Sequence, residues 1–350
     1  MKLRFIQTRA SFALLIPLVL FSVFAVVDAD CECGFAINDT NDYFTHVIYN
    51  NFSSFSPSRT LRSNPDFTRD WVVQKWGIQP QNWATPLAID NQEDNVFLQG
   101  GNLVLRQEGY SKEHILHGSN VSVASIASQN GDIIHGSFRV ELKMENATGG
   151  SCGGFFWYHN DENEIDIEIL AREFKSDSVI VHYTTHPALD ENGHLVKNAT
   201  EVVPLRGDNP AATFQQHRFD WTPTELRFYQ NSTQVHSNAL RVPNVPGHVY
   251  MNLWADGGPW SGSPSTTDVY MSVRTVAIYH NTSASERGVD RTFNLRCEKA
   301  GGPSNLTICL DTSIESGRKD PSSIASTVVP LQVWILSLLC VAFGIVVSAI

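Results

Sequence analysis

Three acidic residues alternate with isoleucines in the run EIDIE at 164–168. Successive side chains of a β-strand point to opposite faces, so Glu164, Asp166 and Glu168 share one face and the isoleucines share the other. Like charges in one row raise the pKa of at least one carboxyl group. An ionised carboxylate beside a protonated carboxylic acid is the pair that cleaves a glycosidic bond with retention, and a third group can hold the nucleophile. The row therefore predicts an active-site strand.

Two other interpretations of this row stay open, namely an acidic strand that faces solvent and a calcium site of oxygen ligands. Retaining chemistry needs the two carboxyl groups about 5–5.5 Å apart. On a flat strand the Cα atoms of Glu164 and Glu168 would lie about 13 Å apart. The catalytic interpretation therefore requires a curved sheet, with a concave face on which an extended sugar chain would lie.

The rest of the chain predicts the elements that position this strand. Short runs of alternating apolar residues recur between Gly, Asn, Asp and Pro, and convincing long amphipathic helices are absent. Many short strands with turns between them are typical of an all-β sandwich or barrel. We expect strands within one domain, at Asn102–Arg106, Val121–Ser128, Gly136–Met144, Cys152–Tyr158, Glu164–Leu170, Ser178–Tyr183, His217–Trp221, Leu226–Tyr229, Val249–Trp254 and Val269–Tyr279.

Four stretches of the chain resemble the family 16 glycoside hydrolases, the clan of laminarinases, lichenases and xyloglucan transferases. They are GSFRVELK at 136–143, GFFWY at 154–158 leading into EIDIE, HRFDWTP at 217–223 with LRFY at 226–229, and MNLW at 251–254. The resemblance implies a jelly-roll β-sandwich with a concave substrate cleft. It also implies that Glu164 is the nucleophile, Asp166 the assisting carboxylate and Glu168 the acid/base. The unbulged spacing is that of the lichenase and transferase side.

The resemblance implies further residues that contact substrate, since aromatic rings cover the apolar faces of sugars. Phe156, Tyr158, Asn252 and Trp254 match family positions that contact sugar. Trp157 points the other way and is expected in the core. Other aromatic and imidazole side chains are less telling: Trp260 fits either a cleft rim or loop packing, while His135 and His182 are expected to be structural.

Two departures from the family pattern bear on the choice of substrate. Lichenase-like members place an aromatic residue two positions before the nucleophile, where this chain has Glu162. The usual Glu-x-Arg of an earlier strand is reversed here, as Arg139 and Glu141. Neither departure touches the acid row, so they affect the expected substrate more than the expected chemistry.

Both ends of the chain resemble processing signals. A basic start, an apolar run and small residues before Asp30 predict a signal peptide at 1–29, with an uncleaved membrane anchor as the alternative. Uncharged residues 328–350 follow a stretch of small polar residues, which predicts a lipid-anchor signal whose tail, 323–350, is removed. The alternative is an uncleaved membrane span. We expect the catalytic domain at 30–299, a tether at 300–322 and the anchor on Ser322, with Ser316 or Ser323 as alternatives.

Glycosylation signals and cysteines agree with a secreted surface protein. Cysteines near both ends of the domain favour bridges that tie the ends together, although sequence does not determine the pairing. No cysteine pair has zinc-site spacing, so no metal and no cofactor are expected. Eight Asn-x-Ser/Thr sequons predict N-linked glycans, at Asn38, Asn51, Asn120, Asn146, Asn198, Asn231, Asn281 and Asn305.

The formal charge of −11 excludes nucleic acid as an expected partner. We expect a monomer at the cell surface, lipid-anchored like fungal cell-wall members of the family. It would act on β-linked glucan as a retaining, endo-acting glycosidase or transglycosidase. The alternatives are a carbohydrate-binding protein without catalysis and a structural wall protein whose acid row binds calcium.

Overall fold

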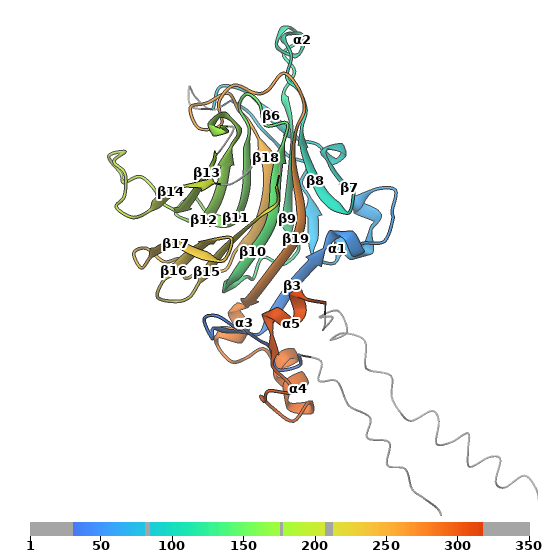
Figure 1. The fold of residues 1–350 in the computed structure, drawn as a ribbon, viewed down its shortest axis with the longest axis vertical. Coiled ribbons are helices and arrows are strands. Elements are labelled where there is room, and N and C mark those ends of the chain that lie inside the picture. The colour runs from blue at the N-terminus through green and yellow to red at the C-terminus, as the bar shows by residue number, and fades with distance from the viewer. Residues whose placement is uncertain (1–30, 81–84, 176–177, 207–212, 318–350) are drawn as a thin grey trace, which may run out of the picture.

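The computed structural model describes residues 31–80, 85–175, 178–206 and 213–317, and the predicted signal peptide and removed tail lie outside these ranges. Two large β-sheets stack face to face (Figure 1). The all-β jelly-roll sandwich expected from the sequence is confirmed, and each of the ten predicted runs lies within a strand.

The sheet that carries the acid row has nine strands. They are β4 Trp71–Val73, β5 Gly77–Ile78, β6 Ile89–Asn91, β9 Val121–Ser128, β11 Cys152–Asn160, β12 Asn163–Leu170, β13 Ser178–Thr185, β14 Thr200–Arg206 and β18 His248–Trp254. Their order is β14-β13-β12-β11-β18-β9-β6-β5, with β4 also paired to β9. The acid strand β12 therefore lies inside the sheet, hydrogen-bonded to antiparallel neighbours on both sides.

The second sheet has eight strands and covers the first. They are β3 His46–Asn51, β7 Val96–Gln99, β8 Asn102–Gln107, β10 Ile134–Glu145, β15 Gln215–Trp221, β16 Leu226–Gln230, β17 Thr233–Asn238 and β19 Val269–Asn281. Their order is β17-β16-β15-β10-β19-β8-β7, with β3 also paired to β19. Strands β3, β7 and β14, among others, were not predicted.

The core between the sheets fixes which way β12 faces. Ile165, Ile167 and Ile169 are buried in the main apolar cluster, together with Trp157, which is fully buried as expected. Because side chains alternate along a strand, this burial turns the acidic residues to the opposite, outer face of the nine-stranded sheet. We call this outer face the acid face.

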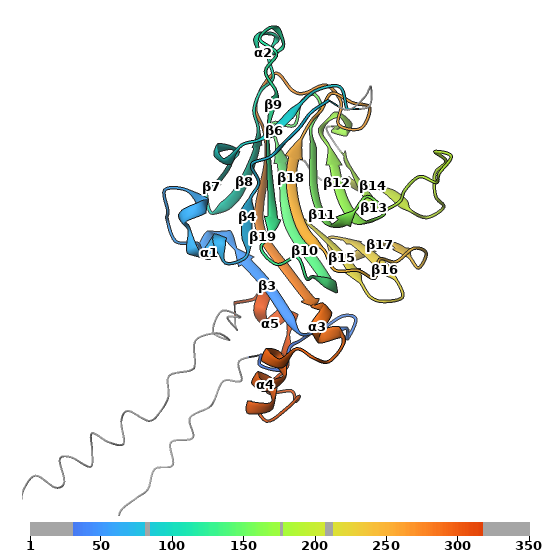
Figure 2. The same ribbon diagram turned by 180° about the vertical axis from the view of Figure 1, so that it is seen from behind.

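A small knob at one end of the sandwich joins the two ends of the described chain (Figure 2). It contains a three-stranded sheet of β1 Phe35–Ala36, β2 Tyr43–Phe44 and β20 Cys309–Leu310, with helices α3 Ser283–Glu286, α4 Arg291–Lys299 and α5 Asp311–Glu315. The other helices are short: α1 Pro65–Thr68, α2 Lys112–Leu116, and 3₁₀ turns at Phe52–Ser54, Leu61–Ser63, Glu93–Asn95 and Ala171–Glu173. None of the helices in the described ranges is long and apolar enough to cross a membrane.

The predicted tether at 300–322 is wrong for its described part, 300–317. Strand β20 pairs with β1, and α5 packs against the outside of the eight-stranded sheet. There the buried guanidinium of Arg139 contacts Asp311 at 2.8 Å and Glu315 at 2.5 Å. The Tyr279 hydroxyl also donates to the Asp311 carbonyl at 3.2 Å. The Gly, Ser and Pro content resembles a linker, but these nonlocal contacts order the segment.

Two disulfides close the knob and settle the pairing that the sequence left open. Cys31 is bonded to Cys309 and Cys33 to Cys297. Cys152 is free and buried.

The predicted modification sites remain predictions. None of the eight sequon asparagines is buried, as glycan attachment requires. Ser322 and Ser323 lie outside the described residues, whereas Ser316 is the C-cap of α5.

Replacing Cys31 and Cys309 together with serine should lower the free energy of unfolding by about 2–4 kcal/mol, because the bridge constrains a long loop of the unfolded chain. Urea unfolding at neutral pH measures the change. The wild type under reducing conditions, where both bridges open, should be at least as unstable as the variant. A variant as stable as the oxidised wild type would contradict this prediction.

Candidate active site

Strand pairing places a neighbour on either side of each acidic residue of β12. Glu164 lies opposite Tyr158 of β11, and Asp166 lies opposite Phe156 of the same strand. Glu168 lies between Gly154 on β11 and His182 on β13. The three carboxylic acids and these flanking residues thus occupy successive rows on the acid face.

Burial makes the acid row electrostatically costly. Asp166 is only 3% exposed, and burial followed by the charge of Glu168 raises its pKa well above the usual range. Burial, and then the charge of Asp166, raises the pKa of Glu164 to about 9. Desolvation disfavours the charged form most strongly at the deepest group. Both carboxyl groups therefore favour the protonated form in the free site, and the nearby His186 acts in the opposite direction on Glu164.

His186 is a member of the site that sequence reasoning missed. It follows the end of β13, where its Nε2 lies 2.8 Å from Asp166 Oδ2 and 4.0 Å from Glu164 Oε2. Its backbone N–H donates to the Glu164 carbonyl at 3.0 Å. A protonated imidazole here would offset negative charge in the row and hold Asp166 in place. The sequence offered one signal for this residue. His186 comes four residues after His182, so an extended chain would turn both side chains to the same face of the sheet.

Two hydrogen-bond donors converge on one oxygen of Glu168. The Cys152 thiol donates to Oε1 at 3.1 Å, and the Trp260 indole N–H donates to the same atom at 3.3 Å. Burial and the nearby Glu168 raise the pKa of the Cys152 thiol, so the sulfur keeps its proton and remains a donor. Trp260 is thereby placed beside the acid row, which favours the rim interpretation over loop packing alone.

An unpaired acceptor lies in the same row of the sheet as Glu168, two strands away. Asn252 on β18 faces Gly154 across the strand pair, and its buried Oδ1 has no hydrogen-bond partner among the described residues. A Cβ at Gly154 would approach this oxygen to 2.6 Å, so glycine is required for the close approach. A buried acceptor without a partner is costly, and a sugar hydroxyl could satisfy it.

The three predicted aromatic residues share the acid face. Phe156 and Tyr158 contact the ring of Tyr250 there, with centroids 5.2 and 6.2 Å apart. Trp254 on β18 pairs with Cys152 and packs beside a small apolar cluster, while its strand neighbour Leu253 is buried in the core. All three rings are half-buried, so each is placed to contact a sugar.

The remaining sequence expectations concern side chains outside the acid row. His182 contacts Glu173 at 2.7 Å and His135 contacts Glu286 at 3.2 Å, so both histidines have protein partners as expected. Arg139 and Glu141 lie on β10 of the other sheet, where the arginine binds the knob. Glu162 is exposed in the turn before β12.

Glu164, Asp166 and His186 could also hold a cation. One ligand atom from each lies within 4.8 Å of the others. Carboxylate and imidazole ligands suit several divalent metals. Calcium prefers oxygen ligands, so the two carboxylates keep the calcium interpretation open beside the catalytic one, whereas the imidazole suits other metals.

Comparison with known proteins identifies the family. The sequence profile described as "Glycosyl hydrolases family 16" matches residues 88–272, more than half of the chain. The chain belongs to family 16 of the glycosyl hydrolases. The matched region runs from β6 into β19 and contains the acid row.

Two curated relatives and one solved structure show how far the likeness extends. "Beta-glucanase" of Bacillus licheniformis is 30% identical over 136 residues, 37% of this chain and 51% of that protein. "Crh-like protein CRH11" of Candida albicans (strain SC5314 / ATCC MYA-2876) is 25% identical over 139 residues, 37% of this chain and 28% of that protein. The solved structure of the Bacillus licheniformis enzyme superposes with a TM-score of 0.50 at 23% identity, over 66% of this chain and 97% of that chain. The chain thus spans about half of the first relative's length, and the structural likeness supports the jelly-roll fold.

Replacing Glu164 with glutamine should change how stability depends on pH. Because the folded state raises the pKa of Glu164 from 4.5 to about 9, it binds this proton more tightly than the unfolded chain. The stabilisation is complete below 4.5 and is lost as pH rises toward 9. The free energy of unfolding of Glu164→Gln, relative to that of wild type, should rise by at least about 1.4 kcal/mol from about pH 5 to about pH 8, the equivalent of one pKa unit. Urea unfolding of both proteins at the two pH values measures this change. A stability difference between the proteins that is the same at both pH values would contradict the prediction.

Proposed function

We propose that this family 16 protein is a retaining, endo-acting glycosidase or transglycosidase that acts on β-linked glucan. The observation that carries the proposal is the row of Glu164, Asp166 and Glu168 on one outer sheet face, within the region that matches the family. The name "Beta-glucanase" of the bacterial relative supports β-glucan as the substrate class.

The proposed reaction has two displacements. A carboxylate oxygen of Glu164 attacks the anomeric carbon while Glu168 gives its proton to the departing glycosidic oxygen. A glycosyl-enzyme ester forms as the glycosidic bond breaks. Glu168, now a carboxylate, then takes a proton from water or from an acceptor hydroxyl, whose oxygen attacks the anomeric carbon and releases Glu164.

Each neighbour of the acid row has a role in this reaction. Asp166, held by His186, lies beside Glu164 and steadies it. The positive charge that develops on the sugar in the transition state favours the ionised form of Glu164. The donors at Oε1 hold Glu168 in one orientation. Phe156, Tyr158 and Trp254 offer rings to the sugar chain, with Asn252 as a polar contact.

The proposed setting is the outer surface of the cell. The apolar amino-terminal run, the eight accessible sequons and the paired cysteines support secretion. The small-residue stretch and apolar tail support a lipid anchor. In this setting the second displacement would use either water or a sugar hydroxyl.

The calcium-binding wall protein is the second candidate function, favoured by the convergence of the Glu164 and Asp166 carboxylates. The two candidates differ in their response to chelation. Catalysis by the acid row should survive EDTA, whereas a structural calcium site would lower the melting temperature when calcium is removed. Calcium-dependent melting that disappears in Asp166→Asn, with no turnover of any β-glucan, would favour the second candidate.

Removing each proposed catalytic acid should give a different chemical signature. Glu164→Ala and Glu168→Ala should each lower kcat on β-glucan oligosaccharides by about 10²–10⁴-fold or more. On an oligosaccharide with an activated aryl leaving group, which departs without a proton from Glu168, added azide should restore turnover in both. In Glu164→Ala azide replaces the nucleophile and gives a glycosyl azide of inverted configuration. In Glu168→Ala it attacks the glycosyl-enzyme and gives the retained configuration. NMR of the product distinguishes them, and the same anomer from both variants would contradict the assigned roles.

The thiol donor at Glu168 can be tested separately. Cys152→Ala removes one hydrogen bond from the acid/base and should lower kcat by about three- to tenfold, since a thiol is a weak donor. Cys152→Ser retains a hydroxyl donor of similar size and should recover most of the rate. Steady-state kinetics on one oligosaccharide measure all three proteins. A Cys152→Ala enzyme with wild-type kcat would show that this contact does not assist the reaction.

A further inference from the structure

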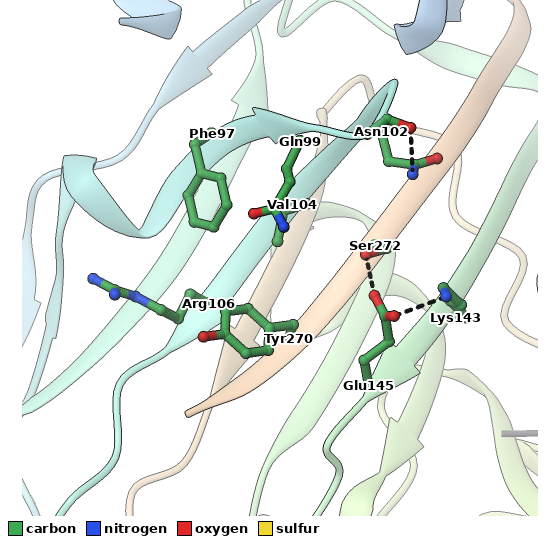
Figure 3. Close-up of a pocket in the computed structure, with 10 residues that line it drawn as sticks. Phe97, Gln99, Asn102, Val104, Arg106, Lys143, Glu145, Tyr270 and Ser272 are labelled. Atoms are coloured by element: carbon green, nitrogen blue, oxygen red, sulfur yellow. Dashed lines mark hydrogen bonds and ion pairs between the residues drawn. The ribbon is translucent and has the colours of Figure 1, made fainter. Parts of the chain in front are cut away.

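The outer face of the eight-stranded sheet carries a trough of about 470 Å³ (Figure 3). It faces away from the core, because the alternate residues Leu103, Leu105 and Met271 of the same strands are buried between the sheets. The trough therefore lies on the opposite side of the sandwich from the acid face. Its volume is within the usual range for sites that bind small molecules.

Strand register explains why this face is hollow. Phe97, Val104, Ser272 and Lys143 stand in one row across β7, β8, β19 and β10. The middle of this row has the small side chains of Val104 and Ser272, which form the floor. Larger residues stand in the rows on either side, with Arg106, Tyr270 and Glu145 along one wall and Gln99 and Asn102 along the other. Four strands at their usual spacing make the trough about 14 Å long.

The charged groups of the trough are already paired and held in place. Lys143 contacts Glu145 at 2.8 Å, and Ser272 donates to the same carboxylate at 2.6 Å. Arg106 donates to Asn95 at 2.8 Å and lies 3.6 Å from Asp268. Positive and negative groups thus balance, which fits a neutral ligand better than a phosphate or an acidic chain.

Two aromatic rings line this polar trough. Phe97 lies at one end of the floor row and Tyr270 stands in the wall, where its hydroxyl donates to Asp268 at 3.1 Å. Both side chains are half-buried. Rings that cover apolar faces, together with amides that exchange hydrogen bonds with hydroxyls, are the chemistry that recognises a neutral sugar chain.

We propose that this trough is a second polysaccharide-binding site, separate from the acid face, that holds a strand of neutral β-glucan. The inference goes beyond the proposed function and rests on it only for the class of polysaccharide. A second site would keep a polymeric substrate attached while the acid face releases one end of a cleaved chain and binds another, as a linked binding module does.

Native gel electrophoresis through soluble β-1,3-glucan and through mixed-linkage β-glucan tests the proposal. The parent protein is the full chain with Glu164→Gln, so that the polymer is not consumed. One variant removes contacts on the acid face, Phe156→Ala with Asn252→Ala. A second removes the rings of the trough, Phe97→Ala with Tyr270→Ala. Leu116→Ala, at an exposed position on α2, is the matched control.

The acid-face variant should still be retarded by polymer, and the trough variant should bind it about tenfold more weakly than the parent, as expected for loss of an aromatic anchor. The two sets combined should abolish retardation, while the control should match the parent. Gln99→Ala changes an exposed residue in the wall of the trough. It should weaken polymer binding and leave the melting temperature unchanged, which separates a loss of binding from a loss of folding.

Several results would overturn this proposal. The trough variant could bind the polymer as tightly as the parent does. The acid-face variant could lose all retardation by the polymer, or the parent itself could show no retardation. Retardation that appears only after the Asn146 glycan is removed would assign the trough to the protein's own sugar chain. Polymer binding without turnover in wild type would reject the proposed enzyme activity and leave the second site standing.

Discussion

The costly interaction in this protein is the mutual repulsion of three carboxyl groups on the outer face of one internal strand. Three isoleucines on the reverse side of β12 anchor it in the core. Hydrogen bonds to β11 and β13 fix its register. A slip of one residue would turn the acids into the apolar core, so the same burial that stabilises the sandwich holds the acids together.

The environment divides the row into two unequal ends. At one end, His186 contacts the buried Asp166 beside Glu164, and burial raises the pKa of the aspartic acid. At the other end, a thiol and an indole donate to a single oxygen of Glu168. Pairs of carboxyl groups in different surroundings are what acid/base division of labour requires. The acid row lowers the stability of the folded state, because folding buries carboxyl groups close to one another. Such a cost is common at functional sites.

Local patterns in the sequence predicted much of this. Alternation located the long strands and the two faces of β12, because period-two patterning is a property of neighbouring residues. The contacts of Cys152 and His186 could not be read in this way, since they depend on which strands pair and on loops that return over the face. The segment 300–317 was misjudged for the same reason. Its composition is that of a linker, but Asp311 and Glu315 bind a buried arginine, Arg139, that lies more than 170 residues earlier in the chain.

The location of the knob gives the two sheet faces their independence. Both ends of the described chain meet there, joined by Cys31–Cys309 at one end of the sandwich. The knob contacts the eight-stranded sheet at Arg139, Arg218 and Tyr279, among others, and none of these three lines the trough or carries the acid row. An attachment at this end would leave both faces open to polysaccharide. The strand order that buries the isoleucines of β12 therefore also allows a sugar chain to approach from either side.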